Sequence, residues 1–133
     1  MRRRDFLRKG SVAAAGLATS KKLLEPVAKA REKGMGILAL KSMAKTTWPV
    51  SQRREHPHPK CWYQPATLPD EAALGLRWTL SHPITAAVPP GDEQYFRLAM
   101  EVAQSFQPIA PEEEKTLMAR AQGVEPIFHL ARA

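Results

Sequence analysis

A short β-compatible run bracketed by prolines constrains the fold of this chain more than any other feature. Ile84–Val88 reads Ile-Thr-Ala-Ala-Val, follows Pro83, and ends at Pro89-Pro90-Gly91-Asp92. Prolines tend to bound strands because they cannot donate to a hydrogen-bonded ladder. The pattern predicts a strand over Ile84–Val88 that leads into the N-terminus of a helix. In α/β proteins such a junction commonly binds a ligand, since the carboxyl end of the strand and the unpaired helical N–H groups meet at one crevice.

A second strand is predicted over Gly36–Lys41, a continuous apolar run of strand length. Such runs are typical of parallel strands that are covered on both faces. A short helix precedes it, beginning at Glu25-Pro26 and ending at Gly34, which makes an αβ unit. We therefore expect an α/β fold with about two parallel strands and four or so helices, mostly helical by residue count.

Three further helices are expected in the body of the chain. The first begins at Leu68-Pro69 and stops at His82-Pro83, the second is capped by Gly91-Asp92, and the third runs from Ala110 to Gly123. Glu112, Glu113 and Glu114 are interpreted as a solvated first turn favoured by the helix dipole. The apolar tail Val124–Leu130 is expected to pack on the last helices.

Between the first strand and these helices lies an irregular stretch, Thr46–Pro69, which predicts a long loop. Trp62 and Tyr63 are expected to anchor this loop on the core. The loop also holds three residues of metal-ligating type, at positions His56, His58 and Cys61. Because a proline follows each histidine and no fourth ligand is near, a solvent-exposed proline-rich loop is favoured over a metal-binding module.

The charge of the chain is concentrated at one end. The formal net charge is +7, but residues 1–33 hold ten Lys and Arg against three acids, while residues 34–133 hold ten against ten. A nucleic-acid-binding face would spread basic residues over the folded surface, so we expect no nucleic-acid partner. The single cysteine excludes an intramolecular disulfide.

The N-terminal segment has the features of an export signal. Arg3-Arg4-Asp5-Phe6-Leu7-Arg8 resembles the twin-arginine (Tat) signal, and a small-residue apolar stretch follows over Gly10–Ala18. The resemblance implies a signal segment over residues 1–20 and the Tat translocation machinery as a partner. It further implies a periplasmic protein, or one held at the membrane by an uncleaved signal. The alternative is a basic solvated tail.

Three runs in the body resemble the C-terminal part of the aldo-keto reductases. They are Lys33-Gly34-Met35-Gly36-Ile37-Leu38-Ala39-Leu40-Lys41, Ala73-Leu74-Gly75-Leu76-Arg77-Trp78-Thr79-Leu80-Ser81 and Ile84-Thr85-Ala86-Ala87-Val88-Pro89-Pro90-Gly91. That family reduces carbonyls with NADPH on a (β/α)8 barrel. The resemblance implies that residues 25–130 are a partial TIM-barrel fragment, with Gly36–Lys41 as barrel strand seven and Ile84–Val88 as strand eight.

In that family the loop after strand eight and the next helix N-terminus hold the adenosine phosphate of NADP. The resemblance therefore implies a set of cofactor-binding positions, Lys41, Pro90, Gly91, Asp92 and Arg97. Asp92 would repel a phosphate where the family favours a base, and Arg97 one turn on is a weak substitute.

No catalytic residue is assigned, because the family's Asp, Tyr, Lys and His come from barrel strands two to four, which this sequence does not show. Neither Lys41 nor Tyr63 is given a catalytic role on these grounds. We expect a truncated aldo-keto reductase-like protein that does not reduce carbonyls by itself. The alternative is a small exported interaction protein whose open strand edges are covered by self-association or by a partner chain.

Overall fold

The computed structural model describes residues 24–128 and divides the chain into two compact units, Met1–Ile37 and Leu38–Ala133. The predicted export signal, residues 1–20, lies outside the described residues. In the first unit a helix covers residues 24–32. It ends as predicted at Gly34, whose φ of +67° is the left-handed conformation that glycine tolerates best.

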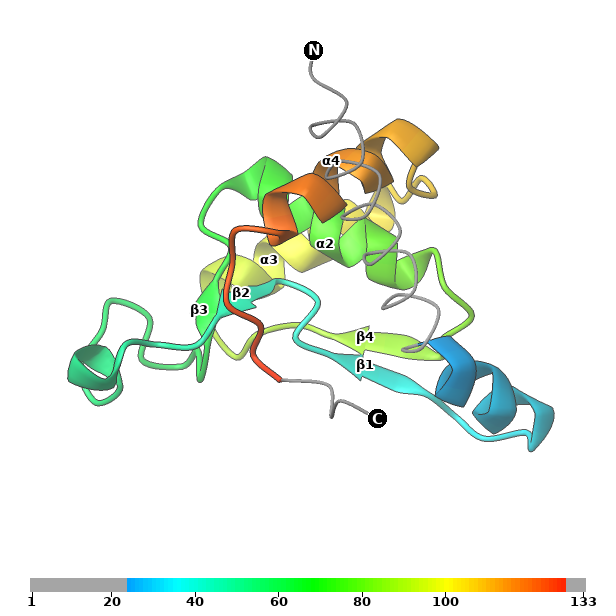
Figure 1. Cartoon of the computed structure of the whole chain (residues 1–133), viewed down its shortest axis with the longest axis horizontal. Helices are drawn as coiled ribbons and strands as arrows, with labels where there is room; N and C mark the ends of the chain where they lie inside the picture. The colour runs from blue at the N-terminus through cyan, green and yellow to red at the C-terminus, as the bar shows by residue number, and fades with distance from the viewer. Residues whose placement is uncertain (1–23, 129–133) are drawn as a thin grey trace, which may run out of the picture. The chain divides into compact units, whose positions relative to one another are not determined.

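The second unit contains the strands and the remaining helices. In chain order its elements are β1 (Leu38–Leu40), β2 (Ala44–Thr46), the short 3-10 helix η1 (Val50–Gln52), β3 (Gln64–Pro65), α2 (Pro69–Leu80), β4 (Ala86–Val88), α3 (Glu93–Gln104) and α4 (Pro111–Ala121). Figure 1 shows this order along the chain. The described residues thus form an α/β fold, as predicted.

Strands β1 and β4 form the predicted parallel pair (Figure 1). Leu38 pairs with Ala86, Ala39 with Ala87, and Leu40 with Val88. Helix α2 lies between the two strands in sequence and packs on β4. Both strands are shorter than predicted: β1 begins two residues later and ends one residue earlier, while β4 begins two residues later and ends at Val88 as predicted.

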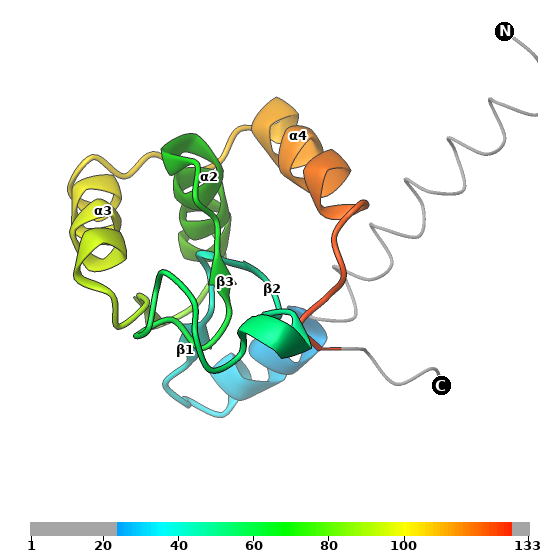
Figure 2. The same ribbon diagram turned by 90° about the vertical axis from the view of Figure 1, so that its left-hand side faces the viewer.

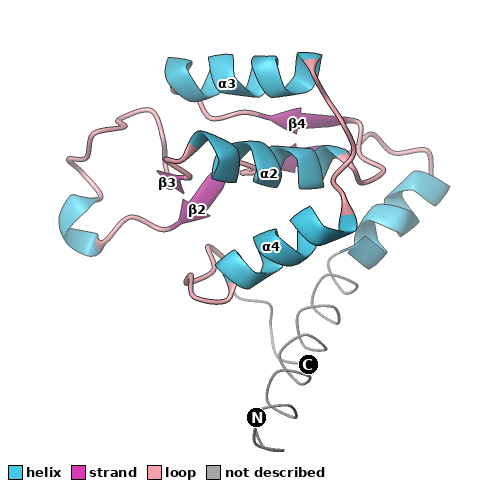
Figure 3. Ribbon diagram, turned by 90° about the horizontal axis from the view of Figure 1, so that it is seen from above, coloured by secondary structure: helices cyan, strands magenta, loops and turns pink. Residues whose placement is uncertain are grey.

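Helices α2, α3 and α4 lie on one side of the parallel pair, as Figure 1 and the turned view of Figure 2 show. Helix α2 is central and packs against both α3 and α4, as the view from above shows (Figure 3). The buried core therefore gathers around α2, and it consists of Met43, Cys61, Ala66, Ala72, Leu76, Tyr95 and Ala99.

The expectation that the strands are covered on both faces is wrong. Ala87 packs against the core, but Leu38 and Leu40 are 65% and 62% exposed and Val88 is 39% exposed. Successive side chains of a strand point to opposite faces. Since the helices of the unit take only one face, alternate residues of the apolar run remain in solvent.

The stretch predicted as a long loop contains an antiparallel pair, β2 with β3, with an irregular register. Strands of two or three residues are too short to show a periodic pattern, so the sequence did not indicate them. The prediction that Trp62 anchors the loop on the core is wrong, because Trp62 is 87% exposed. Trp48 is buried instead and donates its indole N–H to the carbonyl of the buried Cys61 at 2.9 Å.

Helix α4 is attached to α2 by charged side chains. Arg77 donates to both carboxylate oxygens of Glu113, at 2.7 and 2.8 Å, and the indole of Trp78 donates to Glu114 at 3.0 Å. Arg77 also donates to the carbonyl oxygens of Gln107 and Pro108. The interpretation of these glutamates as merely solvated was therefore wrong, since two of the three bind α2.

Candidate functional site

A cavity opens where the parallel strands β1 and β4 both end. We call it the strand-end cavity; its volume is about 430 Å³. Carboxyl ends of parallel strands are the usual ligand-binding edge of an α/β sheet. The cavity is lined by Leu40, Lys41, Lys60, Cys61, Trp62, Tyr63, Pro65, Val88, Pro89, Pro90 and Gly91.

Lys41, which directly follows β1, supplies one of the two cations of the strand-end cavity. Its backbone is left-handed, with φ of 66°, and its carbonyl accepts from the amide of Ala44 at 3.0 Å. The Lys41 Nζ lies 4.9 Å from the ring centre of Tyr63 and 4.8 Å from that of Phe128. These are cation–π distances. The ammonium lies over the face of the tyrosine ring, which holds the cation in place but does not constitute an acid–base pair with the hydroxyl.

The end of β4 supplies a rigid wall made of Pro89, Pro90 and Gly91. Gly91 lies against the backbone of Lys60, such that a Cβ added to it would be 3.4 Å from the Lys60 carbonyl oxygen. This close approach brings the Lys60 segment to the strand ends. The second cation therefore comes from a stretch thirty residues earlier in the chain.

Asp92 lies just beyond the cavity and is occupied by other contacts. Its Oδ1 accepts the backbone N–H of Gln94 at 3.0 Å, capping α3, and its Oδ2 lies 3.6 Å from the Nδ1 of His58. An aspartate at this position satisfies part of the unpaired N–H set of a helix. The N-terminus of α3 is thus already capped by a carboxylate of the chain itself.

Arg97 lies elsewhere. Its guanidinium pairs with Glu93 one turn earlier, at 2.7 Å, on the exposed side of α3, and it does not line the strand-end cavity. Of the five predicted cofactor-binding positions, the fold brings Lys41, Pro90 and Gly91 together at the cavity and leaves Asp92 and Arg97 outside it. Sequence reasoning did not assign Lys60, Trp62 or Phe128 to this site, and no local pattern connects them to the strands.

The three residues of metal-ligating type have other packing partners. His56 stacks on Trp48 with ring centres 3.9 Å apart, and His58 meets the ring of Tyr95 edge-on at 5.3 Å. Burial, and secondarily the charge of Asp92, raises the pKa of the Cys61 thiol, which disfavours the thiolate that metals bind. Over residues 24–128 there is no group of three or more His, Cys, Asp or Glu arranged to hold a metal ion.

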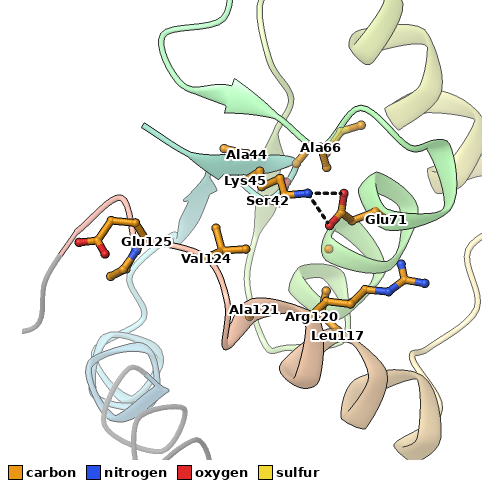
Figure 4. Close-up of a pocket in the computed structure, with 13 residues that line it drawn as sticks. Ser42, Ala44, Lys45, Ala66, Glu71, Leu117, Arg120, Ala121, Val124 and Glu125 are labelled. Carbon is orange, nitrogen blue, oxygen red and sulfur yellow. Dashed lines mark hydrogen bonds and ion pairs between the residues drawn. The ribbon is translucent and has the colours of Figure 1, made fainter. Parts of the chain in front are cut away.

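A second, smaller cavity of about 210 Å³ lies between β2, α2, α4 and the segment that follows α4. Lys45 and Glu71, which both line it, point toward each other and pair at 3.3 Å (Figure 4). Arg120 at its edge pairs with Asp70 at 3.4 Å. Its two cations are thus paired with acids of the chain, and the strand-end cavity is the better candidate for binding an anion.

The segment after α4 runs from the smaller cavity toward the strand-end cavity. Its Glu125 carbonyl accepts from the hydroxyl of Thr46 on β2 at 2.8 Å, and Phe128 meets Tyr63 edge-on at 6.2 Å. The prediction that this tail packs on the last helices holds only for its start, since Phe128 lies beside Lys41. The last residues of the predicted tail lie outside the described part of the chain.

Comparison of the chain with protein-family models, with curated proteins and with solved structures gives no match in any of the three. Within residues 24–128 no helix has both the length and the apolar character needed to cross a membrane.

Proposed function

We propose that this chain is an exported, truncated aldo-keto reductase-like protein whose strand-end cavity binds part of a nicotinamide dinucleotide, and that it does not reduce carbonyls by itself. The observation that carries the proposal is the position of Lys41. It follows β1 directly, and it lines a cavity that the end of β4 also lines. Under the resemblance these are barrel strands seven and eight, the edge where that fold binds phosphate.

The composition of the cavity supports an anionic ligand with a flat ring. Lys41 and Lys60 provide positive charge, while Trp62 and Tyr63 provide aromatic faces on which a planar group can stack. A volume of about 430 Å³ falls within the range of small-molecule sites. Because a whole dinucleotide is larger, only part of it would be enclosed, and we expect weak binding.

The positions of Asp92 and Arg97 support a lack of preference for NADP over NAD. In the family a base near the helix N-terminus selects the 2′-phosphate. Here the Asp92 carboxylate occupies that N-terminus, and Arg97 is paired with Glu93. We therefore expect NADPH and NADH to bind with the same affinity to within about threefold, a difference of less than about 1 kcal/mol.

Binding is tested by titrating the full chain with NADPH and with NADH, following tryptophan fluorescence and calorimetry. Lys41→Gln should weaken binding about tenfold or more, the loss of one charge-assisted contact of about 1.5 kcal/mol. Lys115→Gln is the matched control, because Lys115 is an exposed lysine of α4 paired with Glu112. Absence of binding at millimolar concentration, or equal affinity in the two variants, would refute the binding proposal.

The lack of catalysis is tested separately. With NADPH and a panel of aldehydes, the full chain should consume cofactor no faster than a protein-free blank. Turnover that disappears in Tyr63→Phe or Lys41→Gln would show that these neighbouring side chains do act as an acid–base pair, and would overturn this part of the proposal.

The second candidate, an interaction protein, is favoured by one observation, the uncovered apolar face of the β1–β4 pair.

A further inference from the structure

One face of the parallel pair carries Leu38 and Leu40 from β1 and Ala86 and Val88 from β4. We call it the open face. All four residues are exposed, with 65% and 62% of the two leucines in solvent. The helices α2, α3 and α4 lie on the other side of the strands (Figure 2).

The open face continues into the strand-end cavity. Leu40 and Val88 belong to both, and Trp62 on the cavity wall is 87% exposed. Phe128, which is 65% exposed, lies next to Tyr63 of the same cavity. Parallel strands are normally covered on both faces, and a contiguous apolar surface of this kind marks an interaction site.

The register of the pair gives the open face a shape that matches itself. The large Leu38 is paired with the small Ala86, so one end of the face has a projection on β1 and a depression on β4. Consider a two-fold axis that runs along the strands, midway between two such faces. It places Leu38 over the partner's Ala86, and the same contact forms again in reverse, as an isologous interface requires.

Charge and area are compatible with this contact. Residues 34–133 hold ten basic and ten acidic residues, so two copies of this part of the chain carry no net repulsion. If the exposed parts of Leu38, Leu40, Val88, Trp62 and Phe128 are covered, the area is on the order of 600 Å² per copy, near the roughly 800 Å² of a standard interface.

We propose that two copies of this chain associate through their open faces, related by a two-fold axis along the strands, and that the second copy completes the wall of the strand-end cavity beside Leu40 and Val88. The proposal does not depend on what the cavity binds. It can hold whether or not a nucleotide binds to Lys41.

The first test measures the mass of the full chain by sedimentation velocity over a range of concentrations. The expected species is a dimer of twice 14.8 kDa. Leu38→Lys should shift it to the monomer while the far-ultraviolet circular dichroism of the chain stays unchanged, because Leu38 is largely exposed within one copy. Val50→Lys is the control, since Val50 is 79% exposed on η1 and outside the open face. A folded monomer for the unaltered chain, or equal dissociation by both variants, would overturn the proposal.

The second test exchanges the large residue, Leu38, and the small residue, Ala86. Leu38→Ala leaves a gap opposite Ala86, and Ala86→Leu places two leucines against each other, so each single variant should weaken the dimer by about tenfold or more. The double variant restores one large and one small residue at each contact and should recover most of the loss. A double variant that is as weak as the two single losses combined would contradict this packing, because independent sites add.

Discussion

The contact between Gly75 and the turn after β1 gives the sharpest prediction about the fold. Gly75 lies in the middle of α2, and a Cβ added to it would come within 2.5 Å of the backbone carbonyl oxygen of Ser42. Ordinary contacts between an aliphatic carbon and a carbonyl oxygen are about 3.3 Å or longer. An alanine here therefore forces α2 and the Ser42 turn about 0.8 Å apart.

Two effects of Gly75→Ala have opposite signs. Alanine favours a helix interior over glycine by about 1 kcal/mol, whereas overpacking against backbone costs about 1–3 kcal/mol. Since both atoms in the contact belong to regular or tightly turned backbone, the upper part of that range applies. We expect a net loss of about 1–2 kcal/mol in the free energy of unfolding, or a fall in thermal midpoint of about 5–15 °C.

The measurement is urea unfolding followed by tryptophan fluorescence, with Gly123→Ala as the control. An added Cβ at Gly123 meets no atom within 4 Å, so that variant should stay within about 0.5 kcal/mol of the unaltered chain. If Gly75→Ala is as stable as the unaltered chain or more stable, the close approach of α2 to Ser42 is not a feature of the folded protein.

Three further outcomes are expected. Hydrogen bonds from Arg77 and, secondarily, from the Ala110 amide hold the pKa of Glu113 below its ordinary value of 4.5. The stability that this carboxylate provides is therefore present above pH 4.5 and is lost as the pH falls through the lowered pKa. Glu113→Gln should consequently flatten the pH dependence of stability in that acidic range, and an unchanged profile would count against the Arg77 contact. Trp48→Ala should cost about 3–5 kcal/mol, because Trp48 is buried and hydrogen-bonded to Cys61, whereas the exposed Trp62→Ala should cost less than about 0.5 kcal/mol, both measured by urea unfolding. Replacing Arg3 and Arg4 by lysine should stop export of a folded fluorescent reporter fused to the end of the chain, and continued export would exclude the Tat interpretation.

The sequence predicted those elements whose ends carry local chemical signals. Pro69 at the start of α2, Asp92 before α3 and Gly34 after the first helix each act through their own backbone, so they can be recognised without knowing the fold. The parallel pairing of β1 and β4 also followed from the order of elements. Apart from that pairing, which joins distant residues, each of these features is decided within a few residues of the chain.

The features that sequence reasoning missed depend on residues far apart in the chain. An apolar run does not say how many layers cover a strand, so the exposure of Leu38 and Leu40 could not be foreseen. The aromatic partners of Lys41 come from positions 63 and 128, and the second cation of the cavity comes from position 60. Such contacts form only when the chain folds, and they have no spacing that a sequence pattern could reveal.

The left-handed backbone of Lys41 bears on efforts to make this protein more stable. A left-handed conformation costs a residue other than glycine about 1–2 kcal/mol, and φ at Lys41 is 66°. Lys41→Gly would relieve this backbone cost, and it would also remove the ammonium that lies against the rings of Tyr63 and Phe128. Backbone conformation alone favours glycine here, whereas the proposed binding of an anion requires the lysine side chain, so position 41 is where conformation and the proposed binding make opposite demands on one residue.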